Sequence, residues 1–449
     1  MGAALDFTYR YAAPSRVEAS GGEKGLRLAT CDADLEHPHF LEGRLRHPKQ
    51  VGDMLVSLTD VVRTNYFLPR PALLDPVVTS SDSMIRFEGF SGCCGVYARV
   101  DLPASSLEIE HRERGTTNVD FNEPMRAALS RLTDSDDVRL AVGEDEVSLS
   151  RNDSPVVEKK VKLPLRWLKG FSEVQAYQPR LELAAEIDGA EARRFLRSLP
   201  TTNPPKKPSF VTPAGKGLRL TTREEKGALR VLGLHRLRAL LGVVGRARRL
   251  TAWADPEART SAWELDTDAG RFFLMLSPEV YRGFSGEGQA LSTLGEASYE
   301  DVLNGVRAQL KWQNEIDAGG VAEALGIPEE RVEAALVALG TRGLAGYDVR
   351  TRSYFHRELP FDLGQVESLQ PRLAGARKLV VEKGVRALRQ GAEESWDADV
   401  QGTKVVHSVR LRPDGDRCSC PWFSKHQGAR GPCKHILAAH LAVDARDPA

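Results

Sequence analysis

Residues 418–435 read CSCPWFSKHQGARGPCKH and hold two pairs of metal-ligating side chains. Cys418 and Cys420 form the first pair, Cys433 and His435 form the second, and twelve residues separate the pairs. Three thiolates and one imidazole are a typical tetrahedral ligand set for Zn²⁺, and such a closed set leaves no position for a substrate or a catalytic water. The sequence therefore predicts a structural zinc site with these four residues as its ligands.

Three further histidines compete for the fourth ligand position: His407, His426 and His440, of which His426 lies inside the spacer. A chance cluster of unligated cysteines is another alternative. The paired spacing, in a chain with six Cys and ten His, argues against it.

The residues before the first pair predict a β-hairpin. Val405–Leu411 alternates between apolar and polar residues, and Pro413–Asp416 has the composition of a turn. A returning strand would end at Cys418 and Cys420. Residues two apart on extended backbone point to the same side, so both sulfurs can face one ion.

The second pair predicts the start of a helix. On a regular helix two residues that are two apart diverge by about 200°. We therefore expect Cys433 to lie just before the helix Lys434–Val443, with His435 in its first turn. The hairpin and the helix together make a ββα finger in outline.

The chain as a whole has 449 residues and a mass of 49.4 kDa, which is room for two to four domains of ~100–200 residues each. Its 62 Lys and Arg balance 62 Asp and Glu, so any attraction to nucleic acid is local. We find no apolar run of ~18 residues and no signal-peptide pattern. We expect a cytoplasmic protein with no membrane partner.

Five prolines between Pro200 and Pro213 predict a linker, and charge changes across it. Residues 101–150 hold 5 basic and 12 acidic side chains, whereas residues 201–250 hold 12 and 2. We predict a multidomain α+β fold with four regions: an N-terminal α+β region (1–200), a basic α+β region (201–313), a winged-helix-like segment (314–362) and a C-terminal region with the finger (371–449).

Hydrophobic periodicity places elements before the linker. The predicted strands are Ser83–Phe90, Gly95–Leu102, Val138–Val142 and Val147–Ser150, and the predicted helices are Glu123–Leu132 and Ala190–Leu199.

A basic amphipathic helix is predicted after the linker, between Leu232 and Val244, with arginines around it. Arg246, Arg248 and Arg249 are the candidate phosphate contacts of this region. The alternative is that these side chains are solvated or paired with carboxylates.

Residues 314–362 predict two short helices, a tight turn at Gly326–Pro328 and a hairpin over Leu344–Tyr354, as in a winged helix. The second helix begins with Glu329 and Glu330, which would repel a phosphate backbone. Winged helices also dock proteins, so both uses stay open.

Catalytic motifs are incomplete. Gly-Phe-Ser-Gly occurs at 89–92 and 283–286, but Cys93 and Glu287 stand where a nucleophile elbow needs its final glycine. The chain has no G-x-x-x-x-G-K-[ST] phosphate loop. We interpret Cys93 and Cys94 as small side chains in a tight corner, with a redox or metal pair as the alternative. We expect no catalytic residues and no enzyme activity.

The pattern Cys418-x-Cys420, Cys433-x-His435, followed by Ile436–Ala439, resembles the SWIM-type zinc finger with its signature CxCxₙCxH. Further segments resemble those of bacterial SWIM zinc finger family proteins: Gly89–Val96, Arg114–Asn122, Val157–Phe171, Leu276–Leu291 and Tyr354–Phe361. The resemblance implies zinc binding. It also implies a DNA-binding or protein-interaction role, because SWIM fingers occur in helicase-like ATPases, transposases and regulatory kinases.

These observations lead to one functional expectation and one alternative. We expect a zinc-binding, non-catalytic protein that binds DNA, with Lys425, Arg430 and Lys434 of the finger as candidate contacts besides the three arginines above. The alternative is an adaptor subunit of a larger ATPase-containing assembly, whose partner would be a helicase-like ATPase.

Overall fold

The computed structural model describes residues 7–9, 15–20, 23–28, 39–66, 76–119, 121–143, 161–163, 165–201, 208–255, 257, 260–295, 300–359, 370–392 and 395–446. We call the described residues up to 359 the body and residues 370–446 the C-terminal unit. Helices and several sheets together make an α+β fold, as predicted. Every helix in these ranges is too short or too polar to cross a membrane.

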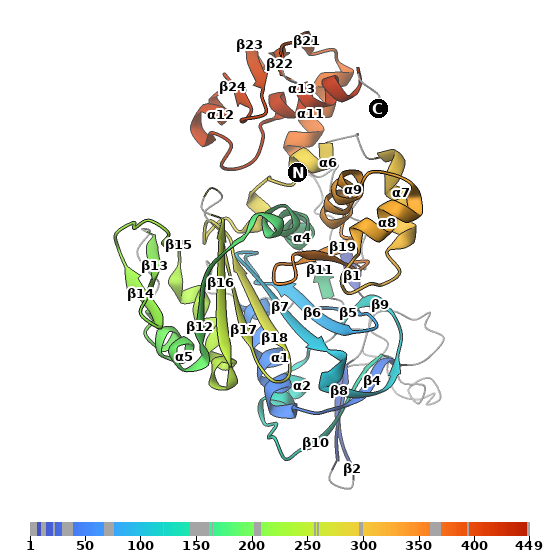
Figure 1. Ribbon diagram of the computed structural model, residues 1–449, viewed down its shortest axis with the longest axis vertical. Coiled ribbons are helices and arrows are strands. Elements are labelled where there is room, and N and C mark those ends of the chain that lie inside the picture. Colours follow the sequence, from blue (N-terminus) through green and yellow to red (C-terminus); the bar gives the residue numbers. More distant parts are fainter. Residues whose placement is uncertain are drawn as a thin grey trace.

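An eight-stranded antiparallel sheet forms the centre of the body (Figure 1). Strands from both sides of residue 200 belong to it, because β7 pairs with β18 and places Val100 opposite Phe272. The predicted boundary at residue 200 therefore falls inside one shared sheet. In spatial order the strands are β12 (Glu182–Asp188), β16 (Arg249–Asp255), β17 (Thr260–Asp266), β18 (Arg271–Leu276), β7 (Val96–Pro103), β6 (Met84–Phe90), β5 (Val77–Ser80) and β9 (Gly115–Asn118).

One face of this sheet is apolar and is covered by helices. Helix α1 (Pro48–Arg63) packs on β6 and β7, and α2 (Glu123–Ser130) packs on α1. On the other half, Phe195 of α5 (Gly189–Arg197) stacks on Trp263 of β17, with the ring centroids 6.0 Å apart. This layer holds the largest core of the molecule.

Smaller sheets surround the central one. A five-stranded sheet has the order β2 (Arg16–Ser20), β3 (Glu23–Leu28), β10 (Asp137–Gly143), β4 (His39–Leu45) and β8 (Leu107–Arg112). A three-stranded sheet contains β14 (Gly217–Thr221), β13 (Ser209–Ala214) and β15 (Leu229–Val231), and β1 (Phe7–Tyr9) pairs with β11 (Val161–Leu163).

The predictions before residue 214 have mixed outcomes. Strands β6, β7 and β10 and helices α2 and α5 confirm five of the predicted elements. The predicted strand Val147–Ser150 lies outside the described residues. The predicted linker ends earlier than Pro213, because β13 begins at Ser209 and pairs Pro213 with Leu218; residues 202–207 lie outside the described residues.

The predicted amphipathic α-helix over Leu232–Val244 is wrong. The segment forms 3₁₀ turns, η3 (Leu234–Gly242) and η4 (Val244–Arg246), because Arg236 is drawn into the core. Its guanidinium donates to the carbonyl oxygens of Gly95 at 2.7 Å and Ser277 at 3.0 Å. Three further 3₁₀ turns among the described residues are η1 (Ala104–Ser106), η2 (Gln178–Arg180) and η5 (Phe284–Gly286).

The segment 314–359 contains two short helices and a hairpin, at the predicted places. The helices α8 (Ala318–Leu325) and α9 (Glu329–Thr341) are joined by a left-handed Gly326, and β19 (Ala345–Asp348) pairs with β20 (Ser353–His356). The hairpin is largely buried and lies on the second face of the central sheet, where Arg99 donates to the carbonyl oxygen of Tyr347 and Arg271 donates to Asp348. We call this second face the charged face. Helix α9 packs against α4 (Leu165–Tyr177), α6 (Leu291–Gly295) and α7 (Glu300–Gln309). The winged-helix class stays a prediction.

The C-terminal unit caps one end of the molecule (Figure 1). Its four strands have the order β21 (Val385–Gln390), β22 (Trp396–Gln401), β23 (Val406–Leu411) and β24 (Arg417–Cys418). The helices are α11 (Pro371–Val381), α12 (Pro421–His426) and α13 (Lys434–Asp444). Ala290 and Leu291 of the body belong to its hydrophobic core, so the unit does not pack alone.

Candidate metal centre

The four predicted ligands lie at the ends of three short elements. Cys418 ends β24, Cys420 is the N-cap of α12, and Cys433 is the N-cap of α13, whose first turn contains His435. Cys420 and Cys433 have extended backbone, with φ −74° and −81°. The predicted position of Cys433 directly before its helix is confirmed.

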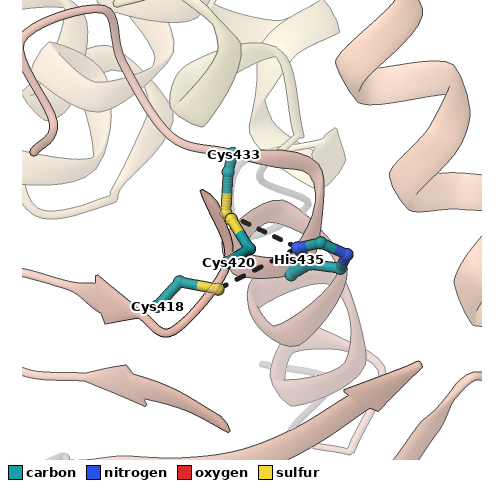
Figure 2. A group of neighbouring side chains, drawn as sticks. All are labelled: Cys418, Cys420, Cys433 and His435. Carbon is teal, nitrogen blue, oxygen red and sulfur yellow. Dashed lines mark hydrogen bonds between the residues drawn. The ribbon is translucent and has the colours of Figure 1, made fainter. Parts of the chain in front are cut away.

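The ligand atoms of these residues converge on one point (Figure 2). Nδ1 of His435 lies 3.9 Å from Sγ of Cys418 and 4.0 Å from Sγ of Cys433, and all four ligand atoms lie within 4.8 Å of one another. Around a tetrahedral Zn²⁺ with Zn–S of ~2.3 Å and Zn–N of ~2.0 Å, the ligand atoms stand roughly 3.5–3.8 Å apart. The four side chains are therefore placed to bind one metal ion.

The competing histidines make other contacts. His440 Nε2 lies 2.6 Å from Asp416 Oδ2, and the ring of His426 packs on Trp422 with centroids 4.7 Å apart. The ring of His407 lies 4.6 Å from that of His435, beside the ligand set. None of the three belongs to the group of ligand atoms found among the described residues.

Hydrogen bonds favour a thiolate at Cys433. The Cys418 thiol, and then His435 and the backbone N–H of Ile436, bond to the Cys433 sulfur and lower its pKa well below that of a free thiol, although burial opposes this. The same bond to Cys433, and then burial, raises the pKa of Cys418. The thiolate is the form of cysteine that binds a metal, and the lowered pKa of Cys433 favours that form.

The unit is fixed to the body by the loop between the two ligand pairs. Arg430 Nη2 donates to the carbonyl oxygen of Gly286 at 2.6 Å. Gly431 has φ +73°, and a Cβ on it would meet the carbonyl oxygen of Gly288 at 1.9 Å. The loop therefore packs tightly against the body segment after η5.

The candidate DNA contacts of the finger differ in how exposed they are and in whether they are bonded to the rest of the chain. The Lys425 side chain is exposed and that of Lys434 is half-buried. Arg430 is committed to Gly286, as above, and leaves Nε without a partner in the described part of the chain. Within the described residues the two lysines make no ion pair, whereas the guanidinium of Arg430 is held by the body through a carbonyl oxygen.

The candidate contacts of the basic region are paired with carboxylates. Arg246 lies 2.6 Å from Asp134, Arg248 pairs with Asp268, and Arg249 lies 2.8 Å from Asp266. The Arg246 pair joins the acidic segment before the linker to the basic segment after it, whereas Asp266 and Asp268 belong to the region after the linker themselves.

Two arginines that the sequence analysis did not single out lie on the finger. Arg410 of β23 and Arg417 of β24 face each other across the strands, and both are exposed. The alternation of β23 could have indicated Arg410, because it shares the solvent side with Ser408. The partner strand β24 is only two residues long, so its pairing register, and with it the position of Arg417 opposite Arg410, could not be predicted from the sequence.

The two Gly-Phe-Ser-Gly segments form a packed corner. Phe284 N donates to the carbonyl oxygen of Cys94 at 2.8 Å, and the rings of Phe90 and Phe284 are 6.1 Å apart. Cys94 has φ +58°, and both vicinal cysteines are buried. This placement matches their interpretation as small side chains in a tight corner.

A second group of acidic side chains has arginine partners. Asp101, Glu264 and Asp348 lie within 4.8 Å of one another and are buried. Arg99 donates to Asp101 at 2.8 Å, and Arg271 donates to Asp348 at 2.6 Å. We interpret the group as an ion-pair network between the sheet and the β19–β20 hairpin.

Comparison with known families identifies the finger. Residues 407–444 match the SWIM zinc finger family, and the four ligands lie within this match. No curated protein is significantly similar to the chain. The crystal structure of Proliferating Cellular Nuclear Antigen from Entamoeba histolytica is similar over 54% of this chain and 99% of that chain, with 10% identity and a TM-score of 0.35. A TM-score this low carries no conclusion about fold or function.

Proposed function

We propose that the SWIM finger binds one structural Zn²⁺ and that the chain is a non-catalytic DNA-binding protein. Three sulfurs and an imidazole nitrogen suit Zn²⁺, which prefers tetrahedral N/S ligand sets. The ligand geometry and the family match support this metal. Elemental analysis of the purified chain should find one zinc per chain, and its absence, with thiols that alkylate freely in the native state, would contradict the assignment.

The observation that carries DNA binding is the arginine pair of the finger. Arg410 and Arg417 lie directly opposite each other, an arrangement that destabilises a sheet unless an anion neutralises it. Within the described residues neither arginine makes an ion pair. Asp397, the other cross-strand neighbour of Arg410, pairs with Arg412 at 2.7 Å.

The surroundings of the arginine pair hold donors for a phosphate backbone together with two carboxylates. A groove of about 770 Å³ passes both arginines and is lined by the serines Ser408, Ser419 and Ser424. Asp414 and Asp416 also line it, and Asp416 Oδ2 lies 2.6 Å from Nε2 of His440. Arginine and hydroxyl donors are the groups that contact DNA phosphates without reading sequence. We infer binding of modest sequence preference through this groove.

A salt titration with matched variants tests this function. Fluorescence anisotropy with a 20-base-pair duplex between 50 and 200 mM salt should show an affinity that falls steeply with salt. The double variant Arg410→Gln/Arg417→Gln should lower the slope of log affinity against log salt by about 2, because each lost phosphate contact removes ~0.9. The control Arg246→Gln/Arg248→Gln removes arginines that carboxylates already pair, and should leave the slope unchanged. Absent or salt-independent binding would contradict DNA binding.

A second candidate function is the adaptor subunit, and the packing of residues 318–356 favours it. A DNA-binding winged helix must bring its second helix and its wing to the duplex. Here the β19–β20 hairpin is buried on the sheet, and α9 begins with two glutamates. A stoichiometric ATPase that co-purifies with the chain, together with weak DNA binding, would favour the adaptor.

A further inference from the structure

A second pocket lies on the other side of the finger from the arginine groove. Its volume is about 500 Å³, and it is lined by the β22–β23 turn, by His407 and by the first residues of α12 and α13. Three of the metal ligands, Cys420, Cys433 and His435, are among its lining residues, so the pocket adjoins the metal centre. Alternation along β23 directs Ser408 and Arg410 to the groove and His407 to this pocket. The groove and the pocket therefore lie on opposite sides of β23.

The walls of this pocket are mostly apolar. Trp422 and Pro421 form one side, and Val405 at the mouth is 58% exposed, which is high for a valine. A nucleobase would place the polar edge of its ring against these apolar walls, and a polar group that is buried without a hydrogen-bond partner is destabilising. An aliphatic or aromatic side chain carries no such cost.

The rim of the pocket is positively charged. Lys404 and Lys434 line it, and the structure shows no ion pair for either within its described residues. Arg372 also lines the pocket but is held by the carbonyl oxygens of Arg430 and Pro432 at 2.7 and 2.9 Å. No carboxylate is among the described lining residues. The charge is complementary to an acidic partner.

We propose that this pocket binds an acidic peptide segment of a partner protein, with one large apolar side chain in the pocket and flanking carboxylates on Lys404 and Lys434. The proposal deepens the adaptor function and rests on it. DNA binding through the arginine groove can fail without affecting it.

Selection from a displayed library of random 12-residue peptides, against the full zinc-loaded chain, tests the proposal. The enriched peptides should carry a large apolar residue flanked by Asp or Glu. Anisotropy of the strongest peptide, labelled with fluorescein, should show at least tenfold weaker binding to Val405→Glu and to Lys404→Glu. Both residues lie in an exposed turn, so the variants should fold.

Matched controls separate the pocket from the rest of the unit. Val381→Glu changes a valine of α11 that is 81% exposed and outside the pocket, and Lys425→Glu changes an exposed lysine of the finger outside it. Both controls should bind the peptide as the unchanged chain does.

If all four variants bind equally, the pocket assignment is overturned and the adaptor function stands. If no peptide is enriched, the pocket proposal is overturned, and co-purification of an ATPase still decides the adaptor function. If a single-stranded dT oligonucleotide displaces the peptide, and its own binding depends on Val405, the pocket is a nucleic-acid site and the proposal is overturned.

Discussion

Arg372 of α11 donates from Nη2 to the carbonyl oxygen of Glu287 at 2.8 Å, and this bond joins the C-terminal unit to the body. The same guanidinium donates to two carbonyl oxygens of the loop between the ligand pairs and packs over the ring of Trp422 at 4.7 Å. One side chain thus contacts the body, the loop and α12.

Arg372→Ala should loosen the finger from the body. Three carbonyl oxygens lose their donor, and each buried unpaired group costs about 1–3 kcal/mol. Hydrogen exchange should become faster at residues 286–291 and 428–432. The control is Lys378→Ala on the same helix, whose exposed pair with Glu382 is worth less than about 1 kcal/mol. Equal exchange in the two variants would show that Arg372 does not hold the interface.

His435→Ala should remove the metal and destabilise the C-terminal unit. A structural metal contributes its binding free energy to folding, so its loss exposes the core that α13 shares with β23. Elemental analysis should find less than stoichiometric zinc, and the first melting transition should fall. His426→Ala is the matched control, because this histidine packs on Trp422 away from the ligand atoms. Retained zinc in His435→Ala would refute the ligand assignment.

The ligands were predictable because their chemistry is local. The CxC pair needs only an extended segment and the CxH pair only a helix start, and both are evident from neighbouring residues. The charged face of the central sheet was not predictable in the same way. Arg86 and Arg99 alternate with apolar residues and look solvent-facing, but a hairpin about 250 residues later in the chain buries them.

The basic region shows a second limit of sequence patterns. The leucine spacing from Leu232 fits a helical face, yet the segment is 3₁₀. Arg236 bonds to the carbonyl oxygens of the residue before β7 and of the residue after β18, and the leucine spacing cannot predict those partners. Counting charged residues correctly showed the local excess of basic side chains. It could not predict the carboxylates that pair with Arg246, Arg248 and Arg249.

Arg236→Met should destabilise the body by about 3 kcal/mol or more. The variant leaves the buried carbonyl oxygens of Leu232 and Ser277 without this donor, and the carbonyl oxygen of Gly95 keeps only the backbone N–H of Ser277. Arg246→Ala, by contrast, removes an exposed ion pair and should cost less than about 1 kcal/mol. Denaturant unfolding of both variants measures the difference, and similar midpoints would contradict the assigned core role.

Asp348→Asn should weaken the contact between the hairpin and the sheet. Burial alone would raise the pKa of Asp348, but Arg99, Arg271 and Arg86 outweigh it and lower the pKa, so the ionised form is the one the network holds. Removing one charge of a buried pair costs about 3–5 kcal/mol. The double variant with Arg271→Gln should cost less than the two single variants together. Additive effects would show that the two residues act independently.

Glu173→Gln should flatten the dependence of stability on pH. Burial raises the pKa of Glu173 to about 8, although the backbone N–H of Gln289 donates to its carboxylate at 2.9 Å. The folded chain therefore holds a proton that the unfolded chain releases near pH 4.5, so the free energy of unfolding falls as pH rises between about 4.5 and 8. Over this range the loss is on the order of a few kcal/mol. Glutamine keeps an acceptor for Gln289 and does not ionise, so the variant should equal the unchanged chain near pH 5 and exceed its stability at pH 8.5. Urea unfolding at several pH values measures both slopes, and parallel slopes would show that Glu173 is not the group that titrates.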